Sequence, residues 1–186
     1  MLEIRRGTAT RTPENIFFRE FSKNLAGMFK KYDVDGLLIG NSECEVESRL
    51  QLDALLIVKN CICIIDFKNY GGEIVLPRND DNFKFGLWIT KDKVTKENIT
   101  IRGGSFINPS LQLNFQKDRF IKVYDKHIKE TIYSEDTVNP FHVAKIVCFH
   151  KPIELVGNIP GKDELVFFIT DSDKYSGSIK DIIDVD

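Results

Sequence analysis

The most hydrophobic part of the chain consists of two segments, residues 50–58 and 61–68, separated by the polar pair Lys59-Asn60. Apolar segments of this length, joined by two residues, are typical of an antiparallel hairpin. If the turn is centred between Lys59 and Asn60, Asp53 and Asp66 lie at equal distances from it and face each other. A buried charge is costly unless it is paired or holds a metal. The two acids therefore indicate a site rather than simple packing.

Apolar residues at helical spacing predict two long helices. Thr12-Pro13 and Asn108-Pro109 are helix-start signals, each with an N-cap residue before proline, and the helices should run over residues 13–31 and from 108 to about 129. A shorter helix is expected over residues 175–183. The buried stripes of the two long helices are Ile16, Phe17, Phe21, Leu25, Met28 and Phe29 in the first and Leu111, Phe115, Phe120, Ile121 and Tyr124 in the second.

The remaining apolar segments predict strands. Short strands are expected at residues 34–39, 73–76, 99–102, 143–149 and 165–169, and residues 41–48 are polar and acidic enough to predict a loop. Alternation over residues 83–90, with Phe83, Phe85, Leu87 and Ile89 on one side, predicts a half-buried strand. The order of elements predicts an α/β (α+β) fold with a mixed central sheet flanked by helices.

Composition places limits on the function. The 186 residues are expected to form a single domain, residues 1–186, with residues 1–11 as a flexible arm. The net charge of −2 means that any nucleic-acid binding must rely on a local patch or a metal. No segment approaches the ~20 apolar residues that span a bilayer. The start of the chain lacks the apolar core of a signal peptide, and the four cysteines fit a reducing, cytoplasmic setting.

The triplet Asp66-Phe67-Lys68 ends the second hydrophobic segment. Asp66 and Lys68 lie on one strand face because they are two residues apart. Mg²⁺ prefers oxygen ligands and supports phosphodiester hydrolysis. Asp53, Asp66 and the backbone carbonyl of Phe67 are suitable ligands. Lys68 could orient or help deprotonate an attacking water, or offset charge on the phosphate. The alternative is that Asp66 and Lys68 form a structural ion pair at a strand end.

Several motifs in order resemble the nuclease-related (NERD) domain of the PD-(D/E)xK nuclease superfamily. They are the strand LQLDALLIV, the strand end IIDFKNYGG, the segment FGLWIT, the helix start Asn108-Pro109-Ser110-Leu111-Gln112 and the strand AKIVCF. The resemblance covers most of the chain and implies a restriction-endonuclease-like core. One departure is Asp66, where the family more often has glutamate, which shortens the reach of the carboxylate by one methylene.

The resemblance implies a nuclease that hydrolyses DNA with Mg²⁺ or Mn²⁺. Asp53 and Asp66 resemble the metal-binding acids, Lys68 the catalytic lysine, and Gln112 a helix glutamine that supports the site or contacts the substrate. Gln116 shares the face of Gln112, four residues away. Glu20 resembles the glutamate of the N-terminal helix, with Glu14 as the alternative. The residues after the triplet, Asn69 and Tyr70, either line the cleft and contact substrate or serve only as turn residues.

Two readings of the function remain open at this point. The first is the active deoxyribonuclease, with RNA as an alternative substrate. The second is a catalytically inactive nuclease-like domain that binds nucleic acid or another protein. Because such domains often precede other modules, a helicase or another module is expected elsewhere in the same protein. No membrane partner is expected.

Overall fold

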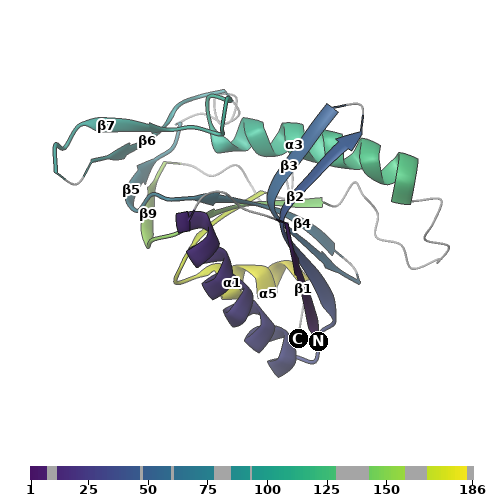
Figure 1. The fold of residues 1–186 in the computed structure, drawn as a ribbon. Coiled ribbons are helices and arrows are strands. Elements are labelled where there is room, and N and C mark those ends of the chain that lie inside the picture. Colours follow the sequence, from purple (N-terminus) through teal and green to yellow (C-terminus); the bar gives the residue numbers. More distant parts are fainter. Residues whose placement is uncertain are drawn as a thin grey trace.

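The computed structural model describes residues 1–7, 12–46, 48–59, 61–77, 85–92, 94–128, 143–157 and 167–183, which form two mixed β-sheets and the helices that cover them (Figure 1). The larger sheet contains, in spatial order, β1 (Leu2–Arg6), β2 (Gly36–Val46), β3 (Ser48–Val58), β4 (Cys61–Lys68), β8 (Val143–Phe149) and β10 (Phe167–Asp171). The smaller contains β7 (Asn98–Ile101), β6 (Trp88–Lys91), β5 (Gly72–Val75) and β9 (Ile153–Val156). The predicted mixed α+β class is confirmed.

Three helices in the described residues lie on the two faces of the larger sheet (Figure 1). Helices α1 (Thr12–Lys31) and α5 (Tyr175–Ile183) cover one face. Helix α3 (Pro109–Val123) covers the other and continues into a π-helical turn, Tyr124–Ile128. Helices α1 and α5 match the predicted bounds to within one residue. Helix α3 begins where predicted but ends at Val123, and only the π-helical turn brings it to Ile128, near the predicted end at about residue 129.

The hairpin of β3 and β4 lies in the middle of the larger sheet. Its register pairs Ala54 with Ile65 and Val58 with Cys61, which confirms the predicted turn position. β4 is buried along its whole length, because β8 pairs with its other edge and helices cover both of its faces. Buried on both faces, such a strand needs a nearly continuous apolar sequence.

Two hydrophobic clusters hold the helices to the sheet. On one face, aromatic residues of α1 pack against Phe67 of β4, and the ring of Phe67 lies 5.1 Å from that of Phe17 and 5.3 Å from that of Phe21. On the other face, Leu113 and Phe120 of α3 pack with Ile64 of β4 and with residues of the smaller sheet. β4 therefore contributes to both clusters through alternate residues.

Two expectations about the N-terminal third are wrong. The expected arm is a strand over Leu2–Arg6, where β1 pairs in parallel with β2, and only residues 8–11 of the arm lie outside the described residues. The expected loop at 41–48 is a continuation of the β2–β3 hairpin, in which Ser42 pairs with Leu52 and Val46 with Ser48. The strand expected at 34–39 is thus the first half of β2.

Two side-chain expectations are also wrong. Ile16 is 54% exposed, although helical spacing placed it in the buried stripe of α1. Phe85 and Leu87 are exposed and precede β6, whose buried residues are Trp88 and Thr90, so the inward face is opposite to the predicted one. Phe83 and Lys84 lie outside the described residues. Strand β9 was not predicted.

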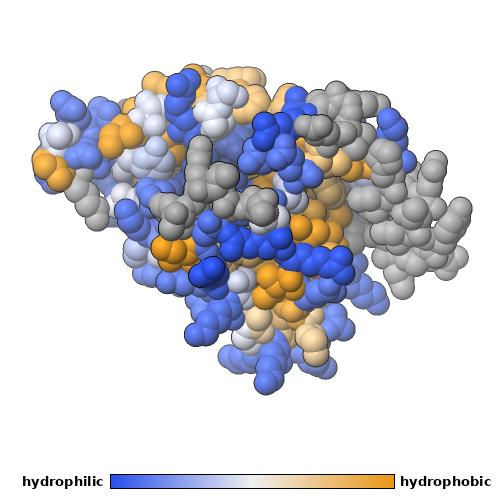
Figure 2. Space-filling view, in the orientation of Figure 1, coloured by the Kyte–Doolittle hydropathy of each residue, from blue (hydrophilic) through white to orange (hydrophobic). Residues whose placement is uncertain are grey.

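The visible surface is mainly hydrophilic, with hydrophobic residues in separate areas (Figure 2). Within the described part of the chain, no helix combines the length and the apolar character that a membrane crossing requires.

Candidate functional site

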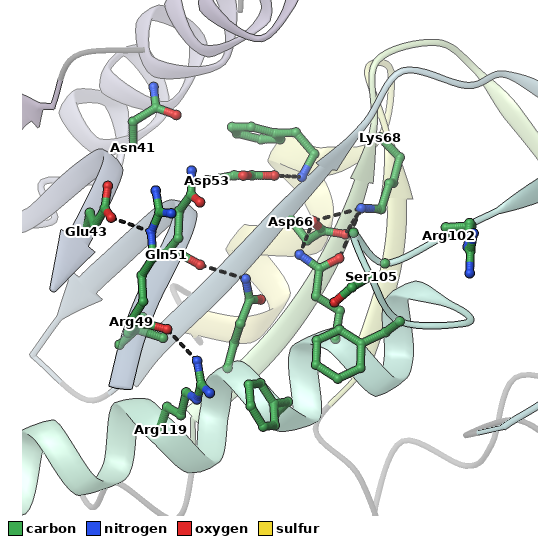
Figure 3. A pocket seen from close by; sticks show the side chains of 18 of the residues that line it. Asn41, Glu43, Arg49, Gln51, Asp53, Asp66, Lys68, Arg102, Ser105 and Arg119 are labelled. Atoms are coloured by element: carbon green, nitrogen blue, oxygen red, sulfur yellow. Dashed lines mark hydrogen bonds and ion pairs between the residues drawn. The ribbon is translucent and has the colours of Figure 1, made fainter. Parts of the chain in front are cut away.

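A cleft of about 990 Å³ opens where the ends of β3 and β4 meet α3 and the loop before it (Figure 3). Its lining residues are largely polar and come from four segments. They are Asn41, Glu43, Arg49, Leu50, Gln51 and Asp53 from the β2–β3 hairpin, Asp66, Phe67, Lys68, Asn69 and Tyr70 from the end of β4, Arg102, Gly103, Gly104, Ser105 and Phe106 from the loop, and Gln112, Phe115, Gln116 and Arg119 from α3.

Strand alternation separates the three residues of the Asp-Phe-Lys triplet. The ring of Phe67 packs into the aromatic cluster beneath α1. Asp66 and Lys68 leave the opposite face of the strand and point towards α3 (Figure 3). The two charged residues are nearly inaccessible, at 2% and 9% exposed, so each needs a partner.

Asp66, Lys68 and Gln112 form a closed network of hydrogen bonds. Lys68 Nζ donates to Asp66 Oδ1 over 3.0 Å and to Gln112 Oε1 over 3.2 Å. Gln112 Nε2 donates to the same Asp66 Oδ1 over 3.1 Å. The N-cap of α3 fixes where Gln112 lies, because Asn108 Oδ1 accepts from Leu111 N and Asn108 Nδ2 donates to the Gly86 carbonyl.

Asp53 lies where the regular ladder stops. Pairing of β3 with β4 ends at Ala54 and Ile65, and Asp53 Oδ2 instead accepts a hydrogen bond of 2.8 Å from Phe67 N. On the other edge, the β2–β3 ladder skips the position of Asp53, where Asn41 has a φ of 48°. The carboxyl group of Asp53 therefore replaces a main-chain acceptor, and it approaches Asp66 closely enough to affect its ionisation.

The two carboxyl groups resist ionising together. Burial raises the pKa of Asp53 to about 7, and the charge on Asp66 adds to the rise. Burial also raises the pKa of Asp66, while Lys68 opposes the rise. A nearby cation would favour the doubly ionised pair.

The donor set fits a hard divalent cation. Asp66 Oδ2 is buried and has no hydrogen-bond partner within the described part of the chain, although Lys68 Nζ lies 2.8 Å away as an ion-pair partner. The described residues hold no group of three or more Asp, Glu, His or Cys side chains suited to a metal. Two carboxylates supplemented by backbone oxygen and water match the coordination that Mg²⁺ usually adopts in proteins.

The structure brings most of the predicted site residues to one place. Asp53, Asp66, Lys68, Gln112, Asn69 and Tyr70 all line the cleft. Glu20 does not: its side chain is exposed on α1, and its charge acts on Tyr175 of α5. The side chain of Glu14 lies outside the described residues. The chemical roles of the clustered residues stay predictions.

Sequence patterns missed several residues of the cleft. Phe115 was expected in the core, but it is 38% exposed and lines the cleft. Arg49 and Arg102 also line it, from segments far apart in the chain. Gly103-Gly104, just before the predicted helix start, was the one local signal that a tightly folded loop lies beside α3.

Comparison with known proteins adds one finding. The family model described as nuclease-related domain (NERD) matches residues 15–150, which include all the residues that line the cleft, Asp53 and Asp66 among them. No curated protein and no solved structure matches the chain significantly.

Proposed function

This chain belongs to the nuclease-related domain family, and we propose that it is a metal-dependent nuclease that hydrolyses phosphodiester bonds of DNA. The observation that carries the proposal is the convergence of Asp53, Asp66 and Lys68 in one cleft, at the end of β4, which is buried along its whole length. Two acids and a lysine are expensive to bury for packing alone. Their arrangement suits a reaction in which a cation neutralises a phosphate.

Mg²⁺ or Mn²⁺ is the proposed cofactor, held by the carboxylates of Asp53 and Asp66. The Phe67 carbonyl is the third candidate ligand. The N–H of Phe67 points to Asp53. Because a residue in an antiparallel strand directs its N–H and C=O to the same side, the Phe67 carbonyl also lies on the side of Asp53. When bound, such a cation neutralises phosphoryl charge and lowers the pKa of a coordinated water.

Lys68 is the proposed catalytic residue. Its ammonium group is held by Asp66 and Gln112 and lines the cleft. From there it can donate a hydrogen bond to a phosphate oxygen or orient the attacking water. Positioning of this kind contributes a large part of the rate in phosphoryl-transfer enzymes.

Gln112 is the proposed positioning residue. It accepts from Lys68 and donates to Asp66, so it fixes both groups relative to each other. Asn69 and Tyr70 lie next to Lys68 along the chain and line the same cleft, where we propose that they contact the substrate strand.

A cleavage screen tests the proposed function. The protein is incubated with single- and double-stranded DNA, linear and circular, with Mg²⁺, with Mn²⁺ and with a chelator. We expect cleavage of at least one substrate that requires the metal. Calorimetry with Mn²⁺ on the wild type and Asp53→Ala complements it. Absence of both cleavage and binding at millimolar metal would contradict the proposal and favour an inactive nucleic-acid-binding domain.

A further inference from the structure

Two aromatic rings and a guanidinium group lie in contact with one another among the residues that line the cleft. The ring centroids of Phe106 and Phe115 lie 5.0 Å apart with an interplanar angle of 51°. The guanidinium carbon of Arg119 lies 3.9 Å from the centroid of Phe115. Arg119 is itself fixed, because its Nη1 donates to the main-chain carbonyl of Arg49. All three side chains line the cleft that contains Lys68.

The loop before α3 holds Phe106 in place. Gly103 and Phe106 exchange two main-chain hydrogen bonds of 3.1 and 2.9 Å, which close a tight turn. A Cβ on Gly103 would lie 2.3 Å from the Asn108 carbonyl oxygen and 2.6 Å from Gln112 Cβ, so only glycine permits this approach to α3. Phe106 is thus positioned before any ligand binds.

These rings do not serve the hydrophobic core. Phe115 is 38% exposed, whereas Phe120 of the same helix is 4% exposed and belongs to the cluster beneath α3. Neither Phe106 nor Phe115 belongs to either hydrophobic cluster of the described residues. An aromatic pair inside a polar cleft, with Phe115 exposed, Phe106 partly buried and a guanidinium over the Phe115 ring, has the composition of a stacking surface for a planar ligand.

We propose that Phe106, Phe115 and Arg119 form a stacking platform for unpaired bases of a DNA strand whose phosphate lies at Lys68. This inference rests on the proposed function and adds a preference for single-stranded or frayed DNA. Along α3, Phe115 and Arg119 follow Gln112 by about 5 and about 10 Å. The platform therefore starts one turn from the centre that holds Lys68. Bases in an intact duplex are stacked on their neighbours and would not be free to use it.

Charge around the platform fits the same ligand. Arg102 lines the cleft, has an exposed side chain and lies in the loop that holds Phe106. On the opposite side, Arg49 also lines the cleft and forms an ion pair with Glu43 (Figure 3). Stacking rings between basic residues are the usual composition of a surface that binds single strands.

The test measures binding separately from cleavage. A 12-nucleotide single strand with one 2-aminopurine, and the same sequence as a duplex, are titrated with the protein in Ca²⁺, with a gel to verify that the strands stay intact. The variants are Phe115→Leu, which keeps an apolar contact with Phe106 but removes the ring, and Phe115→Tyr, which keeps the ring. Phe85→Leu is the matched control, because Phe85 is 64% exposed and lies outside the cleft.

For Phe115→Leu we expect single-strand affinity to fall about 5- to 100-fold, with recovery of 2-aminopurine fluorescence. Phe115→Tyr and Phe85→Leu should bind as the wild type does, and the duplex should bind more weakly than the single strand. Equal single-strand binding by Phe115→Leu and wild type would overturn the platform and leave the proposed nuclease untouched. Failure of the wild type to bind or cut any DNA would overturn both.

Discussion

The two faces of β4 carry side chains of opposite character at adjacent positions of the strand, aromatic on one face and charged on the other. On one face, Phe67 lies among Phe17, Phe18 and Phe21 and contributes to packing. On the other, Asp66 and Lys68 are almost equally buried, yet their contacts are hydrogen bonds to each other and to Gln112. One strand thus contributes adjacent residues to a core and to a polar site.

The difference shows how a rigid site can be built on a strand. Because the aromatic side chain anchors the backbone at Phe67, the flanking charges have fixed directions without packing of their own. The polar face gains order from its network and from α3, whose N-cap at Asn108 determines where Gln112 lies. Substitutions on the two faces should therefore have separable effects on stability and on chemistry.

The largest effect on stability is expected for Phe67→Ala. Loss of a buried ring costs about 3–5 kcal/mol in the free energy of unfolding, and Phe67 is 6% exposed. Urea unfolding followed by circular dichroism measures the change. Asp66→Asn serves as the matched control on the opposite face, where we expect a smaller loss. An equal loss for both variants would contradict the separation of the faces.

The next largest effect on stability is expected for Gly103→Ala. The added Cβ would meet the Asn108 carbonyl oxygen and Gln112 Cβ, so the loop or the start of α3 must shift, at about 1–3 kcal/mol. Thermal unfolding and cleavage rate should both decrease, because Gln112 moves with the helix. Gly104→Asn is the control, since Gly104 has a φ of 61° with open space around its Cβ position, and asparagine tolerates this conformation. If Gly104→Asn proves as harmful as Gly103→Ala, the close approach is not the reason.

Gln112→Met should slow cleavage about 10- to 100-fold with little change in fold, as for other residues that orient catalytic groups. The physical reason is that Asp66 and Lys68 each lose a hydrogen-bond partner. Single-turnover cleavage measures the effect. Gln116→Met, one turn further along α3, breaks only the bond to the Gln51 carbonyl and should leave the rate near that of the wild type. Equal slowing by both would assign Gln112 a merely structural role.

The smallest effect concerns His150, on the aromatic side. Its ring stacks on Phe17 with centroids 4.1 Å apart, and burial lowers the pKa of His150 from 6.5 to about 4. As the pH falls, His150 takes up a proton in the unfolded chain before it does so in the folded protein. The contribution of neutral His150 to the free energy of unfolding is therefore full above pH 6.5 and declines as the pH falls towards 4.

His150→Phe should remove about 1 kcal/mol of that decline, less than a fully buried histidine would give because solvent screens part of the effect. Unfolding midpoints of both proteins between pH 4 and pH 8 provide the comparison. Parallel pH profiles for the variant and the wild type would show that His150 is not responsible.

Local pattern was sufficient to predict the centre of the fold. Symmetry about Lys59-Asn60 gave the hairpin register, and strand alternation placed Asp66 and Lys68 on one face. Both inferences depend only on neighbouring residues, whose geometry is set by the regular β-strand. The family resemblance, confirmed over residues 15–150, led to Gln112, which lies in the cleft.

The errors arose where distant segments decide the outcome. β1 has a largely polar sequence with four exposed residues. It forms a strand because it pairs in parallel with the edge of β2. Helical spacing could not show that Phe115 faces the loop at Phe106 instead of the core. The assignment of Glu20 rests on order along the chain alone and stays a prediction; its side chain is exposed on α1 and does not line the cleft.

The central claim is that the polar face of β4 is a metal-dependent catalytic site. Cleavage of DNA by wild type, Asp66→Ala and Lys68→Ala, measured with Mg²⁺ or Mn²⁺ alongside circular dichroism of each protein, tests it most directly. We predict metal-dependent cleavage by the wild type and its loss in both variants, with the fold retained. Cleavage at the wild-type rate by the two variants would contradict the claim.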